Sequence, residues 1–396
     1  MSARTILFCV LLATPLGLAH PHGAEEREFQ HAAQPWYRRS LDHCAEALSE
    51  PGLARRTVER RTGELQRLRR SRGIKDIARS TDPKLARSSS SPVIHGRDFD
   101  AVLDRDHRVN KSYNEYTPPS ELFGGSGACM LTPEQTEGPL CKNRPSLPQE
   151  YVTGEQVRRD LTEGEGGVKM TLDIQVVDVR TCLPIANAAV DVWSANSTGV
   201  YGGVLNFPGN GNPHDRSLIN ATAFRGIQFT DSEGMATFDT IVPGHYAGRT
   251  NHVHAIAHIG ATRQPNNTIT GGRVAHIGQV YFDQNLLDAV EDLPPYSDNR
   301  QAFTDNAQDE PMRAAAAGAE DDPVVRYALV GRALADGIYA WIRFGVDADA
   351  SRPLDPAGWV DETGGHQNNP NPGGPALPAW AWRSKTRRSK MRLDGD

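Results

Sequence analysis

Histidines concentrate in one short stretch of the sequence. Five of the 13 histidines lie between His245 and His276, and this group includes His252, His254 and His258. In an extended strand successive side chains point to opposite faces, so these three would share one face. Neighbouring imidazoles on one face can bind a metal ion through their ring nitrogens. Histidines that are simply hydrogen-bonded within a sheet show the same spacing, so the pattern alone leaves both interpretations open.

Two tyrosines in the same part of the chain strengthen the metal interpretation. Tyr246 lies just ahead of the histidines, where a turn would return it toward them, and Tyr201 follows an expected strand at 189–193. Phenolate is a hard anionic ligand that suits Fe(III). The metal must lower the phenol pKa from about 10 by ~3 units, or ~4 kcal/mol, to bind phenolate at neutral pH. Each tyrosine taken alone is also compatible with packing of its ring in the core.

The elements that would position these residues are short strands. Between Val168 and Val176 apolar and polar residues alternate, which predicts a half-buried strand. Further strands are expected at 189–193, 227–229, 236–238, 252–259 and 274–282. The turn sequence at 232–234 predicts that the strands at 227–229 and 236–238 form a hairpin. Short strands divided by Gly, Pro and Asn turns indicate a mainly β fold with a β-sandwich core.

The residues before and after this region have a different character. Leu41, Cys44 and Leu48 share one helical face, and an arginine-rich helical segment follows, so helices are expected between about 36 and 72. We interpret these arginines as a solvated helix face balanced by Glu59 and Glu64, rather than as a site for an anionic partner. Beyond 347 the chain turns to Pro, Gly and Asn, which predicts a disordered tail.

The N-terminus has the features of a secretory signal peptide. A short positive start precedes an apolar run at 6–13 and small residues at 17–19. The predicted organisation is a signal peptide at 1–19, a helical and linker region at 20–124, a β-sandwich catalytic domain at 125–346 and a tail at 347–396. No later segment approaches the ~20 apolar residues of a membrane span, so we expect a secreted, extracellular protein with no membrane span.

Composition excludes several classes of protein. The chain has 396 residues, of which 38% are hydrophobic, and its formal net charge is −6. It is too polar for a multi-span membrane protein, yet apolar enough to form a core. A general nucleic-acid binder should be basic, so no nucleic-acid partner is expected.

Cysteine usage also fits export. Cys9 would leave with the signal peptide, and the remaining cysteines are Cys44, Cys129, Cys141 and Cys182. An even number in an oxidising compartment suggests two disulfides, for which three connectivities exist. Sequons that export would expose to glycosylation begin at Asn110, Asn196, Asn220 and Asn266.

Several ordered motifs resemble the intradiol ring-cleavage dioxygenases (the catechol and protocatechuate dioxygenases), and in particular their secreted fungal branch. The resemblance is carried by residues 199–201, Gly-Val-Tyr, and by 243–254, Pro-Gly-His-Tyr-Ala-Gly-Arg-Thr-Asn-His-Val-His. Segments 132–139, 171–176 and 276–283 agree with that branch. The resemblance spans roughly 125–346 and implies the sandwich fold of those enzymes.

This resemblance implies one non-haem Fe(III) per chain, bound by two tyrosines and two histidines. By their positions in the motifs the ligands are Tyr201, Tyr246, His252 and His254. The substrate would be a small aromatic diol of the catechol type, cleaved with O₂ between its hydroxylated carbons to a cis,cis-muconate-type product. Tyr246 would leave the metal and accept a substrate proton, Arg249 would stabilise developing negative charge, and Gln279 would orient the substrate.

The motifs also bear on the disulfides and on the substrate. Cys129 precedes the first motif and Cys182 follows the long strand, which favours a Cys129–Cys182 bridge. Residues 140–150 interrupt the family pattern, and Ser194 stands where relatives often have Cys or His. The substrate preference of relatives therefore does not transfer, and a homodimer is compatible with the sequence.

The sequence leaves two other functions open. A secreted copper-binding oxidoreductase would use His20 as a new N-terminal residue, although Pro21 lacks the amide proton that a tripeptide copper site must lose. A non-catalytic β-sandwich that binds a glycan or another secreted protein would need no metal. The metal content of the protein would distinguish the copper-binding oxidoreductase from an iron enzyme. Turnover of catechols would exclude the non-catalytic binding protein.

Overall fold

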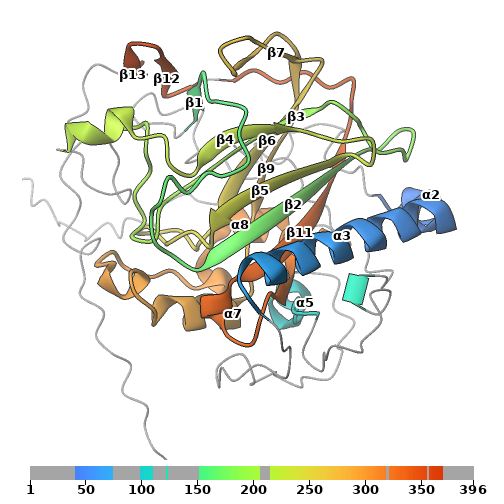
Figure 1. Ribbon diagram of the computed structural model, residues 1–396, viewed down its shortest axis with the longest axis horizontal. Coiled ribbons are helices and arrows are strands. Elements are labelled where there is room, and N and C mark those ends of the chain that lie inside the picture. The colour runs from blue at the N-terminus through green and yellow to red at the C-terminus, as the bar shows by residue number, and fades with distance from the viewer. Residues whose placement is uncertain are drawn as a thin grey trace, which may run out of the picture. The chain divides into compact units, whose positions relative to one another are not determined.

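Two four-stranded sheets form the centre of the structure (Figure 1). The computed structural model describes residues 41–74, 99–109, 122–123, 151–205, 215–317, 321–354 and 356–368. The first sheet has the order β10-β11-β2-β5, with bounds β10 Arg326–Leu329, β11 Ile338–Val346, β2 Lys169–Asp178 and β5 Met235–Ile241. The second has the order β4-β3-β6-β9, with bounds β4 Arg225–Phe229, β3 Ala189–Ser194, β6 Val253–Ile259 and β9 Arg273–Val280. Each strand expected from the sequence is present.

Apolar side chains from both sheets pack into one core. Leu172 of β2 and Phe238 of β5 belong to the same buried cluster as Val192 of β3, Ala255 of β6 and Val280 of β9. Fully burying a large apolar side chain contributes about 1.5–3 kcal/mol, so this shared core is what holds the sheets face to face. The predicted mainly β sandwich is confirmed.

The expected hairpin between 227–229 and 236–238 is wrong. β4 pairs with β3 in the second sheet, whereas β5 pairs with β2 in the first. The turn between them carries the chain from one sheet to the other. Asp231 Oδ1 accepts hydrogen bonds from the backbone N–H groups of Glu233 and Met235, and Gly234 adopts a φ of 71°. Turn residues indicate where a chain reverses, but not which strands pair afterwards.

Strand β2 is buried on both faces, although its alternation predicted a half-buried strand. The polar side chains of Thr171, Asp173 and Gln175 belong to residues that are 0% exposed. The reason is helix α3, Pro51–Ser71, which lies across β2 and β11 and covers the polar face of the first sheet (Figure 1).

The interpretation of the α3 arginines as a solvated face holds for Arg55, Arg56 and Arg70, which are exposed, and is wrong for Arg60 and Arg61. The Arg60 guanidinium donates a hydrogen bond to Asp173 at 2.6 Å. Arg61 is 6% exposed and lies over the Trp341 ring, 5.2 Å from its centroid. The hydrogen bond to Asp173 compensates the burial of the Arg60 charge, whereas burial of Arg61 over the Trp341 ring lowers the pKa of Arg61 to about 10.

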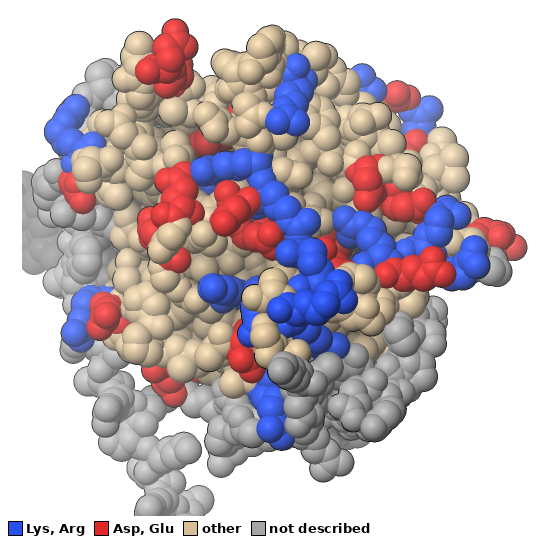
Figure 2. Space-filling model, viewed as in Figure 1, with Lys and Arg blue, Asp and Glu red and all other residues tan. Residues whose placement is uncertain are grey.

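The expected pairing of the helix acids with arginines is present. Glu59 lies 3.8 Å from exposed Arg55, and Glu64 lies 2.5 Å from Arg67 and also pairs with Arg159. Figure 2 shows the result, with basic and acidic side chains intermixed over the face on which α3 lies. An exposed pair such as Arg55–Glu59 contributes little, about 0–1 kcal/mol.

The described structure continues past 347, where the tail was predicted to begin. β12, Gly358–Asp361, pairs antiparallel with β13, Gly364–Gln367, and parallel with β1, Val152–Thr153. Strands this short and rich in glycine have no readable period, so the boundary at 347 was placed too early. Residues 369–396 lie outside the described part of the chain.

The remaining elements are short. They are η2 Asp42–Cys44, α2 Ala45–Ser49, α5 Phe99–Asp104, η3 Arg216–Asn220, β7 Thr262–Arg263, β8 Ile269–Thr270, α7 Gln284–Glu291, η4 Tyr296–Asp298, η5 Asn306–Gln308, α8 Glu310–Ala315 and η6 Leu334–Asp336. The helices expected between 36 and 72 correspond to α2 and α3. Across the described residues, no helix has the length and apolarity to cross a membrane. The predicted signal peptide, Asn110, Cys129, Cys141 and 140–150 lie outside the described residues.

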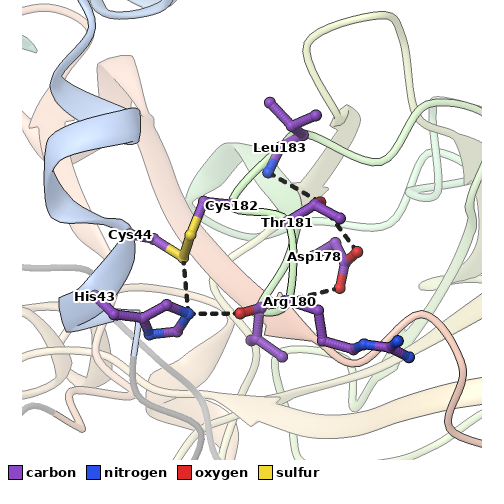
Figure 3. Close-up of a disulfide and its surroundings, with 8 residues drawn as sticks. His43, Cys44, Asp178, Arg180, Thr181, Cys182 and Leu183 are labelled. Atoms are coloured by element: carbon purple, nitrogen blue, oxygen red, sulfur yellow. Dashed lines mark hydrogen bonds between the residues drawn. A yellow bond between two sulfur atoms is a disulfide. The ribbon is translucent and has the colours of Figure 1, made fainter.

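Cys182 is bonded to Cys44, so the predicted Cys129–Cys182 bridge is wrong (Figure 3). Leu41, Cys44 and Leu48 pack against Val177 and Val179 at the end of β2, and this apolar contact brings the two sulfurs together. His43 lies beside the bridge, with its Nε2 3.4 Å from Cys44 Sγ. The bond ties the N-terminal helices to the turn that follows β2, a pairing that depends on tertiary packing.

Removal of this bridge is expected to lower the free energy of unfolding. The bond joins residues separated by 138 positions, and in the chain-entropy model a loop of that length is worth about 5 kcal/mol. Removal of a native disulfide typically lowers the free energy of unfolding by about 2–5 kcal/mol. We therefore expect a decrease of that size for a Cys44→Ser/Cys182→Ser double variant, measured by urea unfolding. A double variant as stable as the unmodified protein would contradict the expectation.

His107 carries a positive charge between two buried carboxylates. Its Nδ1 lies 2.5 Å from Asp283 Oδ1, and its Nε2 lies 3.0 Å from Asp322 Oδ2. Burial disfavours the imidazolium, but Asp322 and Asp283 more than offset this effect and raise the pKa of His107 to about 10. The charged ring thereby fastens the segment after α5 to the residues that follow β9 and precede β10.

The raised pKa of His107 predicts a loss of stability in alkaline solution. The folded chain holds this proton up to about pH 10, whereas the unfolded chain releases it near 6.5. The free energy of unfolding should therefore be highest below pH 6.5 and fall as pH rises toward 10, by up to about 1.4 kcal/mol per pH unit. Urea unfolding between pH 6 and pH 10 measures this slope, which His107→Gln should reduce. The same pH dependence in both proteins would contradict the assignment.

Candidate metal centre

His252 and His254 lie on the outer face of the second sheet. The inward residues of β6, including Val253 and Ala255, belong to the core between the sheets. The alternation of side chains then directs His254 and Ile256 outward, and His252 immediately precedes the strand on the same face. The two histidines are thus held by a rigid strand and point away from the sandwich core.

The rings of the two tyrosines and two histidines converge. His252 Nε2 lies 3.1 Å from His254 Nε2 and 3.4 Å from Tyr201 Oη. The Tyr246 ring centroid lies 5.9 Å from that of Tyr201 and 5.6 Å from that of His252. None of the four residues is more than 3% exposed. The structure therefore brings all four candidate ligands into one buried cluster.

His252 presents an unprotonated nitrogen to this cluster. Its Nδ1 donates a hydrogen bond to the backbone carbonyl of Thr250 at 2.6 Å, which leaves the lone pair on Nε2. Burial, the positive charge of Arg249 and the neighbouring His254 hold the pKa of His252 well below its usual range. A neutral ring whose other nitrogen is fixed by a backbone carbonyl is the arrangement usual for a metal-binding histidine.

The donor set fits a ferric ion. Two imidazole nitrogens and a phenol oxygen face one another, and a second phenol ring stands beside them. Imidazole suits iron, and phenolate is the hard ligand that a trivalent ion favours. Among the His, Cys, Asp and Glu side chains that the structure describes, ligand atoms also gather within 4.8 Å at His43, Cys44 and Cys182. There the disulfide removes both thiolates, which are the metal-binding form of cysteine.

The sheet register places one residue on each side of His254. Trp193 is its partner on β3, and Gln279 is its partner on β9. The Trp193 ring is stacked on the imidazole, with centroids 4.7 Å apart and planes 5° from parallel. His254 is therefore fixed laterally by an aromatic ring on one strand, while Gln279 comes from the strand on its other side.

Arg249 joins the tyrosine side of the cluster to Gln279. Its Nη1 donates to Tyr246 Oη at 3.4 Å, and its Nη2 donates to Gln279 Oε1 at 2.6 Å and to Tyr281 Oη at 3.2 Å. Burial disfavours the charged guanidinium, but Asp309, Tyr246 and Tyr281 raise the pKa of Arg249 well above its usual range. A permanent positive charge thus stands beside the candidate ligands.

Asp309 is part of this arrangement and was missed from the sequence. Its Oδ2 accepts hydrogen bonds from Arg249 Nε at 2.8 Å and from the Thr250 N–H at 2.9 Å, and its Oδ1 accepts from the Met312 N–H at 2.7 Å. The Asp-Glu-Pro sequence at 309–311 is typical of a helix start, so the capping role was readable. The sequence pattern does not indicate that Asp309 pairs with Arg249, which lies 60 residues earlier.

His258 shares the outer face of β6 with the other two histidines, as predicted, but lies further along the strand, where it pairs with Ala189 of β3. The register of β6 with β9 shifts between Ala257 and His258. His258 Nε2 lies 4.0 Å from Asp191 Oδ2, and burial lowers the pKa of His258 to about 4. The ring is therefore neutral at physiological pH and is placed beside a β3 carboxylate.

Residues 137–293 match the dioxygenase family. That segment contains all six candidate residues: Tyr201, Tyr246, Arg249, His252, His254 and Gln279. No curated protein matches the sequence.

Solved dioxygenase structures are similar to part of the chain. An intradiol ring-cleavage dioxygenase from Tetranychus urticae is 25% identical over 57% of this chain and 98% of its own, with a TM-score of 0.44. The dioxygenase domain of a carbohydrate-binding fusion protein from Streptomyces sp. SirexAA-E is 26% identical over 55% of this chain and 98% of its own, with a TM-score of 0.32. Catechol 1,2-dioxygenase from Pseudomonas arvilla C-1 is 19% identical over 56% of this chain and 65% of its own, with a TM-score of 0.33.

Proposed function

We propose that this protein is an extracellular non-haem Fe(III) dioxygenase that cleaves catechol-type aromatic diols between their hydroxylated carbons. The observation that carries the proposal is the convergence of Tyr201 Oη, His252 Nε2 and His254 Nε2 beside the Tyr246 ring. The dioxygenase family match of 137–293 supports the reaction class. The products would be of the cis,cis-muconate type.

The ferric ion would be held by Tyr201, Tyr246, His252 and His254. When bound, Fe(III) supplies Lewis acidity that favours the doubly deprotonated diol and makes its ring susceptible to O₂. The burial of all four ligands limits access of bulk water, which strengthens the electrostatic effect of every charge nearby. The two histidines are neutral ligands, so both negative charges of the ligand set would come from the tyrosines.

The chain's own residues would handle protons and charge. Hydroxide from the solvent would accept one of the two substrate hydroxyl protons, and Tyr246 Oη would accept the other as the diol takes its place. Arg249 Nη1 lies 3.4 Å from that oxygen, so its positive charge would face both the departing tyrosine and the negative charge that develops on the substrate. Gln279, hydrogen-bonded to Arg249 and to the Tyr281 hydroxyl, would orient the substrate from the β9 side.

Secretion is part of the proposal. It is supported by the signal-peptide pattern at 1–19 and by the Cys44–Cys182 disulfide, because such bonds persist in oxidising compartments. Sequons at Asn220 and Asn266 lie at exposed residues, where export would make them accessible to glycosylation.

The proposal is tested on purified full-length protein. We expect about one iron per chain by elemental analysis and a red to burgundy colour from phenolate-to-iron charge transfer. Anaerobic addition of catechol should change that colour, and admission of O₂ should then yield a ring-opened diacid with matched O₂ uptake. Protein stripped of iron with a chelator is the control.

Other outcomes overturn the proposal. Copper in place of iron would favour an oxidoreductase of another kind. An iron-reconstituted protein that is colourless and leaves a panel of catechols intact would favour a non-catalytic binding protein. Ring opening beside the two hydroxylated carbons, rather than between them, would overturn the intradiol assignment.

A further inference from the structure

We propose that Gln301 is a positioning residue that fixes the loops bearing Tyr201 and Tyr246 against each other. The inference rests on the proposed iron site and extends it to a residue outside the ligand motifs. The two tyrosines come from separate segments, one after β3 and one between β5 and β6. Their rings can stay in one geometry only if something joins these segments.

One side-chain amide forms hydrogen bonds with both segments close to the tyrosines. Gln301 Nε2 donates hydrogen bonds to the backbone carbonyls of Thr198 at 3.0 Å and Gly199 at 3.1 Å. Gln301 Oε1 accepts from the backbone N–H of Ala247 at 3.3 Å. The amide therefore reaches the chain just before Tyr201 with its nitrogen and just after Tyr246 with its oxygen.

The two loops also touch each other directly. A Cβ atom added to Gly199 would lie 1.9 Å from the His245 carbonyl oxygen and 2.5 Å from Gln301 Nε2. Gly199 also adopts a φ of 76°, which disfavours residues with a side chain. Any side chain at position 199 would therefore clash with the His245 carbonyl and with the Gln301 amide.

The segment that carries Gln301 is itself held in place. Asn299 Nδ2 donates to the His245 carbonyl at 2.8 Å, and Asn299 Oδ1 accepts from the Gln301 N–H at 3.0 Å. His245 Nε2 lies 3.1 Å from the Gln301 carbonyl oxygen, and its Nδ1 lies 2.8 Å from Glu291 Oε1. Gln301 is 3% exposed, so water cannot readily replace its hydrogen bonds.

These contacts link Gln301 to the metal site rather than to stability alone. The distance between the two phenol oxygens depends on the relative placement of their loops, and Gln301 binds the backbone of both. Without its two N–H donors the Tyr201 loop would still be joined to the Tyr246 loop by the hydrogen bond from the Gly244 N–H to the Asn196 carbonyl at 3.0 Å, but it would lose the two bonds nearest Tyr201. Replacing a residue that orients a metal ligand without binding the metal typically lowers metal affinity by about 10- to 100-fold.

The test compares Gln301→Glu with Gln301→Leu in the full-length protein. Glutamate keeps the shape and the acceptor for Ala247 but loses the donors to Thr198 and Gly199, whereas leucine loses both. Gln264→Leu, in the β7–β8 turn, is the matched control because its side chain donates to the nearby Thr262 carbonyl. Gln301→Asn retains the amide but is one methylene too short to reach both loops, and it replaces either variant that fails to fold.

Three readouts are taken on each protein: iron loss to a chelator, the position of the charge-transfer band, and the melting temperature without iron. We expect both Gln301 variants to lose iron about 10- to 100-fold faster, with a shifted band, and the control to match the unmodified protein. A lowered melting temperature with unchanged band and iron loss would make Gln301 merely structural and overturn the inference. An unmodified protein that binds no Fe(III) would overturn the proposed function, and the inference with it.

Discussion

His254→Ala is expected to leave the protein folded but almost free of iron. His254 stands in the middle of the second sheet, between Trp193 and Gln279, and its Nε2 faces that of His252 at 3.1 Å. Alanine removes a proposed ligand, and no other side chain on that strand can take its place at the same position. Replacing a residue that only orients a metal ligand lowers metal affinity by up to about 100-fold. Because His254 is itself a proposed ligand, we expect a larger fall in iron affinity and loss of the visible colour.

Iron per chain after chelator challenge measures this effect, and circular dichroism confirms that the sheet persists. His258→Ala is the matched control, because it removes the same side chain from the same strand next to Asp191. We expect that control to keep its iron and colour. Full iron retention in His254→Ala, or equal losses in both variants, would contradict the ligand assignment.

Arg249→Ala is expected to keep its iron and lose ring cleavage. The guanidinium is fixed by Asp309 and reaches toward Tyr246 and Gln279, so its charge acts on the reacting groups without binding the metal. Removal of one such stabilising donor costs about 10²- to 10³-fold in kcat. We therefore expect a loss of that size in O₂ uptake with catechol, while the charge-transfer band of the resting protein remains.

Two further variants sharpen this prediction. Arg249→Lys keeps the charge but cannot donate at once to Asp309, Gln279 and Tyr281, so it should recover little of the lost rate. Arg263→Ala, at the exposed β7–β8 hairpin, should leave the rate unchanged. An unchanged kcat in Arg249→Ala would overturn the role of this arginine, and loss of iron would show that it supports the metal instead.

The sequence by itself determined the local features of the site. Alternation in β2 was readable because a strand with one apolar face repeats every two residues. The same period predicted that His252, His254 and His258 would share a face; His252 and His254 meet in the cluster, and His258 lies further along the strand beside Asp191. The ordered motifs then singled out Tyr201 and Tyr246, whose rings the structure places beside the histidines.

Which residues far apart in the sequence contact one another is determined only by the tertiary structure. The alternation of β2 showed which face was polar, but not that α3 would bury Thr171 and Asp173. The turn after β4 showed a reversal, but not that the chain would cross to the other sheet. The apolar contacts of Leu41 and Leu48 with Val177 and Val179, rather than the spacing of cysteines, set the disulfide.

The same distinction separates the candidate ligands from the residues that support them. Candidate ligands are constrained in type and spacing, because the chemistry needs an imidazole or a phenol at a fixed point of a strand or turn. Asp309 and Gln301 hold the backbone and charge of residues 60 and 102 positions away, and any part of the chain with a suitable carboxylate or amide could have done so. A sequence pattern records local geometry, whereas these contacts exist only once the sandwich has folded.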